Sequence, residues 1–228
     1  MSALPEENLD LPAAVLWDLD GTIVDTEPYW IECEYALVES YGGTWSEKHA
    51  KNLVGNNLPD SGRYIAEHGP VPLSSEEIVA RLTEGVVERI RRHIPWRPGA
   101  AELLADLNAA GVPCALVTMS YRDLADAIVA CLPAGTFQAT VVGDEVTHGK
   151  PHPEPYLRAA ELLGVDPADC VAVEDSPTGV ASATAAGVPV LAVEHLLPVL
   201  PAPGRHVVRT LEGVTPADLV EWTTPLRG

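Results

Sequence analysis

Short apolar runs alternate with helical patterns along most of the chain, and this alternation limits the possible folds more than any other feature. The apolar runs lie at residues 13–17, 112–117, 139–142, 170–173 and 188–193. Helical patterns occupy residues 100–110, 121–132, 153–164 and 176–187. Strands that alternate with helices in this way form parallel sheets with right-handed crossovers. We therefore expect an α/β core, with a further edge strand near 206–209 and a last helix at 216–222.

The segment after the first apolar run has a different texture. It has almost no strand-like runs, and charged residues at helical spacing dominate it, for example at residues 76–94. Glycine and proline breaks divide it near residues 42–43, 55–59 and 69–70. This pattern predicts a helical module inserted after the first strand, at residues 27–96, with residues 1–26 and 97–228 forming the core.

The charge balance excludes two classes of partner. The chain has 228 residues and carries 33 acidic against 14 basic side chains, a formal net charge of −19. Binding to nucleic acid or to an anionic membrane surface needs clustered cations, so neither is expected. The N-terminus, MSALPEENLD, lacks the basic and apolar regions of a secretory signal, which favours a cytoplasmic location.

Two aspartates follow the first predicted strand, in the string Asp18-Leu19-Asp20-Gly21. A sharp turn at Gly21 can bring both carboxylates around one small volume, where they repel each other unless a cation is present. Mg²⁺ is the hard divalent ion that suits such oxygen ligands and a substrate phosphate. The alternative is that Asp18 and Asp20 only cap a turn or helix.

Three other polar stretches are expected at the same edge of the sheet, because ligands bind beyond the carboxyl ends of parallel strands. They are Thr118-Met119-Ser120, Gly149-Lys150-Pro151 and Glu174-Asp175-Ser176. Lys150 is the only lysine outside the inserted segment, and it can supply a cation for a phosphate. The alternatives are a solvated lysine, a threonine that only closes a strand, and N-capping of the following helix by Asp175 or Ser176.

The sequence motifs of several other kinds of catalytic or metal site are absent or incomplete in this chain. Pro151 stands where a phosphate-binding Walker loop needs Ser or Thr, and no G-x-S-x-G string occurs. His148 and His152 are four residues apart, but Pro151 and Pro153 prevent a helix there. A zinc site built on a helical histidine pair is therefore not expected.

Four strings, taken in order, resemble the motifs of the haloacid dehalogenase superfamily. They are WDLDGTIVDT (17–26), LVTMS (116–120), GKPHPEPY (149–156) and VAVEDSPTGVASATAAG (171–187). The inserted segment resembles the helical cap of the branch with β-phosphoglucomutase and phosphoglycolate phosphatase. The resemblance implies a Rossmann-like parallel-sheet core with a helical cap domain inserted after the first strand.

The resemblance also implies roles for residues at matching positions. Asp18 would be the nucleophile that forms an aspartyl phosphate, and Asp20 the general acid and base. Mg²⁺ would be held by Asp18, the backbone carbonyl of Asp20, and Asp175, with Glu174 assisting. Thr118, Met119 and Lys150 would bind the phosphoryl group. The implied function is hydrolysis of a small phosphate ester, such as a sugar or polyol phosphate. We expect the protein to be a monomer or weak homodimer.

Departures from the family bear on the substrate. Asp20 argues against a dehalogenase, because halide needs no protonation. β-Phosphoglucomutases resemble this chain but have histidine where Trp30 stands and arginine near Leu58, which favours a phosphatase over a phosphosugar mutase. In the cap, Asn56, Asn57, Arg63 and Trp30 are candidates for substrate specificity, although Trp30 also fits a packing role between helices. A protein that only senses a phosphate ester is the third alternative.

Overall fold

The computed structural model describes residues 11–54 and 57–223, and a six-stranded parallel sheet forms its centre. The strand order is β3-β2-β1-β4-β5-β6. The strands are β1 (Ala14–Trp17), β2 (Cys114–Val117), β3 (Ala139–Val141), β4 (Cys170–Glu174), β5 (Val190–Val193) and β6 (Arg205–Val208). The strands expected from the apolar runs are all present, within a few residues of the predicted bounds.

Helices cover both faces of this sheet, which explains why its central strands are apolar throughout. Successive side chains of a strand point to opposite faces. Val15 and Trp17 of β1 accordingly belong to one core cluster, and Ala14 and Leu16 belong to the other. The first cluster includes residues of α5 (Ala100–Ala109), α6 (Arg122–Val129) and α9 (Pro216–Thr223), and the second those of α7 (Glu154–Leu163) and α8 (Pro177–Ala185).

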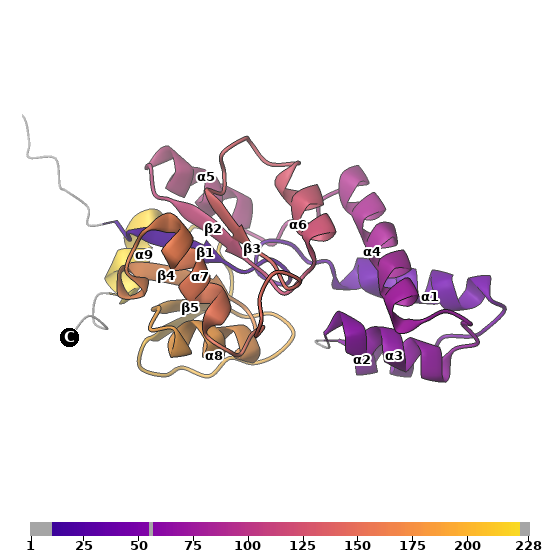
Figure 1. Cartoon of the computed structure of the whole chain (residues 1–228). Coiled ribbons are helices and arrows are strands. Elements are labelled where there is room, and N and C mark those ends of the chain that lie inside the picture. Colours follow the sequence, from indigo (N-terminus) through magenta and orange to yellow (C-terminus); the bar gives the residue numbers. More distant parts are fainter. Residues whose placement is uncertain (1–10, 55–56, 224–228) are drawn as a thin grey trace, which may run out of the picture.

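The segment between β1 and α5 forms a separate group of helices, at the right of Figure 1. They are α1 (Glu27–Ser40), α2 (Glu47–Leu53), α3 (Leu58–His68) and α4 (Ser75–Arg92). Local signals set their starts. Ser74 and Glu77 form a reciprocal capping box at α4, and Ser46 caps α2 through the backbone N–H of His49. We call α1–α4 the cap.

The chain enters and leaves the cap through two adjacent segments. The backbone N–H of Asp25 donates to the carbonyl of Pro95 (2.8 Å), and that of Arg97 donates to Ile23 (2.8 Å). Val24 and Trp96 form an isolated antiparallel bridge between these segments. Helix α4 of the cap also packs against α6 of the core (Figure 1). The cap is therefore tied to the core at a narrow crossing and along one helix.

The observed architecture confirms the expected fold class: an α/β parallel-sheet core with helices inserted after the first strand. Within the described ranges, every helix is too short or too polar to span a bilayer.

Candidate active site

Asp18 and Asp20 lie where β1 ends, and Gly21 makes the turn that follows them. The backbone N–H of Asp18 donates to the carbonyl of Val173 (3.0 Å), which continues the pairing with β4. Gly21 has φ +92°, and a Cβ at this position would fall on the carboxylate of Asp175. Only glycine allows both the left-handed backbone and this close approach. The expected turn at Gly21 is confirmed.

Lys150 connects this turn to β2 and β4 although it comes from a loop before α7. Its Nζ donates to Oδ1 of Asp18 (2.7 Å) and to Oε1 of Glu174 (2.5 Å). It also donates to the backbone carbonyl of Val117 at the end of β2 (2.9 Å). The Lys150 side chain is only 5% exposed, so it is not a solvated surface lysine.

Glu174, the last residue of β4, is fully buried and makes hydrogen bonds with both carboxylate oxygens. Oε1 accepts from Lys150 and from the hydroxyl of Tyr156 (2.9 Å). Oε2 accepts from the backbone N–H of Asp175 (3.1 Å) and from the N–H and hydroxyl of Ser176. With so many donors, Glu174 is placed to orient Lys150 and the start of α8.

Asp20 points toward two hydroxyl groups. Its Oδ1 accepts a short hydrogen bond from Thr26, and its Oδ2 accepts from Ser120 (2.5 Å) after β2. Ser120 is itself positioned by its backbone N–H, which donates to Oγ1 of the buried Thr118 (3.0 Å). A hydroxyl can both donate and accept, so these two neighbours suit either protonation state of Asp20.

The charges at this edge of the sheet are not balanced by Lys150 alone. Burial and the nearby Glu174 raise the pKa of Asp18 well above its ordinary value, despite the opposing effect of Lys150. The same two causes raise the pKa of Asp175 to about 7. Burial alone would lower the pKa of Lys150, but Asp18 and Glu174 raise it. One ammonium group therefore faces several buried carboxylates, and further positive charge would stabilise their ionised forms.

The donor set fits a hard divalent cation. Asp18, Glu174 and Asp175 each offer a carboxylate oxygen, and these oxygens lie within 4.8 Å of one another. Since the oxygens of Glu174 already serve other donors, Asp18 and Asp175 are the more available ligands. Oxygen donors, burial and the deficit of positive charge together match Mg²⁺.

A pocket of about 340 Å³ lies over these groups and extends to the cap. The core side of its lining includes most of the expected site residues: Asp18, Asp20, Thr118, Met119, Lys150 and Asp175. Trp30 and Asn57 line it from the cap side. Asn57 also caps α3, because its side chain accepts from the N–H of Asp60 (2.9 Å). Two of the cap residues that the sequence suggested as specificity candidates therefore do line the pocket.

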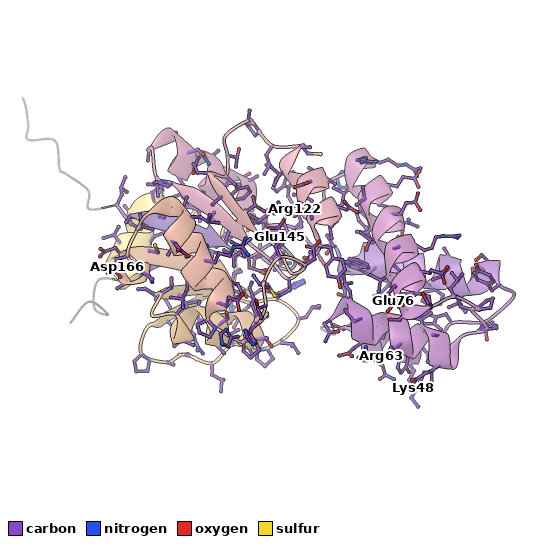
Figure 2. The ribbon with its side chains drawn as sticks, in the orientation of Figure 1. Lys48, Arg63, Glu76, Arg122, Glu145 and Asp166 are labelled. Atoms are coloured by element: carbon purple, nitrogen blue, oxygen red, sulfur yellow. The ribbon has the colours of Figure 1, made fainter. Side chains whose placement is uncertain are left out.

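A third specificity candidate, Arg63, does not line the pocket as expected; its side chain is 60% exposed and pairs with Asp60 on α3. In Figure 2, Arg63 lies on the outer side of the cap. A specificity role for Arg63 is therefore not supported by its position. Asn56 lies outside the described residues.

Several residues of the site were missed by sequence reasoning. His195 lines the pocket two residues beyond β5, and its Nε2 lies 3.6 Å from Oδ1 of Asp25. The rule that ligands bind beyond strand ends would have included His195. Tyr156 and Thr26 belong to the matched motif strings, but only the fold shows that their hydroxyls bind Glu174 and Asp20.

A larger groove, of about 840 Å³, lies between α4 and α6, away from the catalytic groups. Its lining carries the acidic residues Glu76, Glu84, Asp123 and Asp126 and the single basic residue Arg91. This excess of acidic side chains repels a negatively charged phosphate ester. The smaller pocket over Asp18 is therefore the candidate substrate site.

The comparison with protein families matches this arrangement. A family model described as haloacid dehalogenase-like hydrolase matches residues 15–193. Among curated proteins, hexitol phosphatase A from Escherichia coli (strain K12) is 36% identical over 185 residues, which cover 78% of this chain and 81% of that protein.

Solved structures show the same fold. The crystal structure of CbbY from Rhodobacter sphaeroides in complex with phosphate superimposes with a TM-score of 0.80 and 25% identity, over 92% of this chain and all of that chain. The structure of a putative β-phosphoglucomutase from Thermotoga maritima gives a TM-score of 0.73 and 28% identity, over 93% of this chain and 99% of that one.

Proposed function

Because the chain belongs to the haloacid dehalogenase-like hydrolases, we propose that it is a Mg²⁺-dependent phosphatase acting on a small sugar or polyol phosphate. The observation that carries this proposal is the buried pair of Asp18 and Lys150, 2.7 Å apart at the floor of the pocket. Lys150 places a fixed cation beside a carboxylate, where the transferring phosphoryl group needs both a nucleophile and charge stabilisation.

Asp18 is the nucleophile in this proposal. One of its carboxylate oxygens attacks phosphorus, the bond from phosphorus to the substrate oxygen breaks, and an aspartyl phosphate forms. Lys150 and Thr118 hold the phosphoryl oxygens during transfer. Water then attacks phosphorus, which releases inorganic phosphate and restores Asp18.

Asp20 moves the proton in both steps. In its protonated form it donates to the leaving oxygen of the substrate, and as a carboxylate it then takes a proton from the attacking water. Thr26 and Ser120 keep the Asp20 side chain at one place while its protonation state changes.

Asp18, Asp175 and the backbone carbonyl of Asp20 are the proposed ligands of Mg²⁺. When bound, Mg²⁺ would neutralise the carboxylates and the negative phosphoryl oxygens. Glu174 acts indirectly, since it orients Lys150 rather than offering a free oxygen.

We also propose that residues 27–96 are a cap domain and that residues 1–26 and 97–228 are the catalytic core. The adjacent crossings at Asp25–Pro95 and Ile23–Arg97 support this division.

The cap sets the substrate class. Trp30 and Asn57 form an apolar face and a hydrogen-bonding group above the catalytic residues, which suits a polyhydroxylated carbon chain. The relative named hexitol phosphatase A supports the same class. The structural similarity to a putative β-phosphoglucomutase makes a phosphosugar mutase the second candidate.

Phosphate release from a panel of hexitol, hexose, pentose and nucleoside monophosphates tests the proposal. We expect Mg²⁺-dependent release that is highest for a sugar or polyol phosphate and is lost on chelation. A mutase would instead isomerise a sugar phosphate, with a trace bisphosphate as activator, and would release little phosphate. Binding of these esters without either reaction would indicate a sensor.

A further inference from the structure

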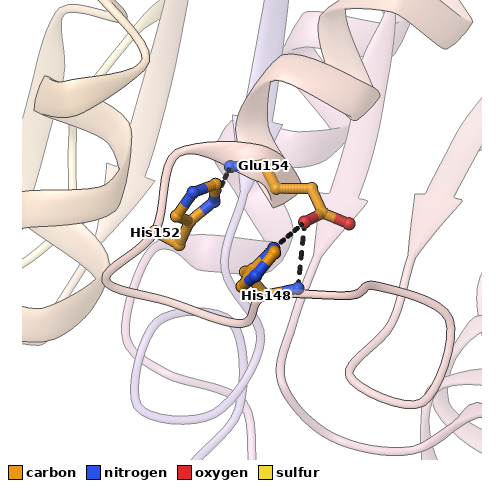
Figure 3. Close-up of side chains that lie close together, drawn as sticks. All are labelled: His148, His152 and Glu154. Atoms are coloured by element: carbon orange, nitrogen blue, oxygen red, sulfur yellow. Dashed lines mark hydrogen bonds and ion pairs between the residues drawn. The ribbon is translucent and has the colours of Figure 1, made fainter.

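Two histidines and a glutamate meet in the loop that carries Lys150, on the outside of the molecule. The ring centroids of His148 and His152 are 4.6 Å apart, with 32° between the ring planes. Together with Glu154, each residue offers a ligand atom within 4.8 Å of the others. Figure 3 shows the three side chains gathered around one side of the loop. Pro151 and Pro153 do exclude a helix here, but the loop brings the histidines together without one.

Hydrogen bonds already fix this arrangement. The carboxylate of Glu154 accepts from the backbone N–H groups of Thr147 (2.7 Å) and His148 (2.9 Å), and it lies 3.0 Å from Nδ1 of His148. The backbone N–H of Glu154 reaches Nδ1 of His152 (3.2 Å), and Ser182 holds the carbonyl of His152 (2.6 Å). The loop is therefore fixed at both histidines before any ion binds.

The protonation pattern leaves lone pairs for a metal. When neutral His148 donates from Nδ1 to Oε2 of Glu154, its Nε2 lone pair is free for a metal. Oε1 of Glu154 accepts from the backbone N–H of Thr147 and has a second lone pair that can bind the same ion. The Nδ1 of His152 carries a lone pair that now accepts a long hydrogen bond. Both histidines are exposed, so an ion can reach them from solvent.

We propose that His148, His152 and Glu154 form a site for a divalent transition metal such as Zn²⁺, separate from the magnesium site at the sheet edge. Two imidazoles and one carboxylate are a donor set of zinc sites and leave positions for water. The same set is poor for Mg²⁺, which prefers oxygen ligands alone. A bound ion would link both ends of the Gly149-Lys150-Pro151 segment and stabilise the loop.

Isothermal titration of the full chain with Zn²⁺, in saturating Mg²⁺ to occupy the other site, tests the proposal. We expect one Zn²⁺ site. Its affinity should fall at least about 100-fold in His148→Ala and in His152→Ala, since loss of a ligand costs no less than loss of a supporting group. His93→Ala, at another exposed histidine, is the matched control and should bind as the parent does.

Glu154→Gln removes the anionic ligand at nearly unchanged side-chain size, and its amide oxygen can still accept from one of the two loop N–H groups that Glu154 binds. We expect at least about tenfold weaker Zn²⁺ binding in this variant. Nitrogen resonances of the His148 and His152 rings should shift on Zn²⁺ addition, and those of His93 should not. Unchanged Zn²⁺ affinity in either histidine variant or in Glu154→Gln, or no binding at all, would overturn the proposal.

Discussion

The carboxyl edge of the sheet and the cap side of the same pocket differ in how their polar side chains are used. At the sheet edge, Asp18, Lys150 and Glu174 are buried and bind one another across three segments distant in sequence. In the cap, Asn57 and Arg63 bind Asp60, within their own helix. A change at the edge therefore breaks contacts shared by several elements, whereas a change at Asn57 or Arg63 alters the hydrogen bonds of one helix and the contacts of any substrate that touches it.

The largest expected effect is at Asp18. Asp18→Asn retains the size of the side chain and removes the nucleophilic oxygen charge, so phosphate release should fall by about 10⁴-fold or more. Steady-state assays with the best ester of the panel measure this. A variant with more than a tenth of the parent activity would show that Asp18 is not the nucleophile.

Lys150→Met should damage both activity and stability. It leaves Asp18 and Glu174 without their buried cation, and breaking such a pair costs about 3–5 kcal/mol of unfolding free energy. Urea unfolding without Mg²⁺ measures the loss. Lys51→Met is the control, because Lys51 pairs with Glu47 at an exposed position and such pairs contribute little. Equal stability of the two variants would contradict the contrast between the regions.

A change on the cap side of the pocket should be smaller and depend on the substrate. Asn57→Ser retains an oxygen to cap α3 but removes the side-chain NH2 of a residue that lines the pocket, a group that also donates to Oδ2 of Asp60 (2.7 Å). Loss of one hydrogen bond should raise KM by about two- to tenfold for a polyol phosphate, with kcat nearly unchanged. Arg63→Ala, outside the pocket lining, should leave both constants as they are. A large fall in kcat for Asn57→Ser would instead show that the cap takes part in the chemical step.

The last expected effect is pH-dependent and is measured on stability, at Glu34 in α1, a residue that also lines the pocket. Burial raises the pKa of Glu34 from its ordinary 4.5 to about 7, with an opposing effect of the hydrogen bond from Trp45 and a further rise from Glu27. The folded state thus binds this proton more tightly than the unfolded state does. Proton binding by Glu34 therefore contributes fully to the stability of the folded state below about pH 4.5, and this contribution is lost as the pH rises through 7.

Glu34→Gln removes this dependence and can still accept from Trp45. Above pH 7 the variant should be more stable than the parent, by at most about 3 kcal/mol, and the two should converge near pH 4.5. Thermal unfolding across this range measures the difference. Glu39→Gln, at an exposed position of the same helix, should show no such divergence. Parallel stability curves for Glu34→Gln and the parent would show that Glu34 is not strained by burial.

The sequence was sufficient to predict the sheet and the gathering of Asp18, Asp20, Lys150 and Asp175, because each follows a recognisable strand or precedes a helix. Parallel strands end at one edge, so their positions follow from topology alone. Which side chains touch depends on rotamers and packing, and the role of Glu174 in holding Lys150 and Tyr156 could not be read from spacing.

The cap was harder to predict for a physical reason. Its helices could be recognised from the sequence, but their orientation over the core determines which residues face the pocket. For this reason Asn57 lines the pocket and Arg63 does not, although both were candidates. The meeting of His148 and His152 was missed because helical spacing was the only geometry considered, whereas a loop bonded to Glu154 brings them together.

Acid quench of the enzyme during turnover with Mg²⁺, followed by mass spectrometry of its peptides, shows whether Asp18 is the nucleophile. We expect one added phosphoryl group on the peptide that contains Asp18, removable by hydroxylamine and absent in Asp18→Asn. Rapid release of phosphate with no label on that peptide, or a label on a different residue, would contradict this role of Asp18.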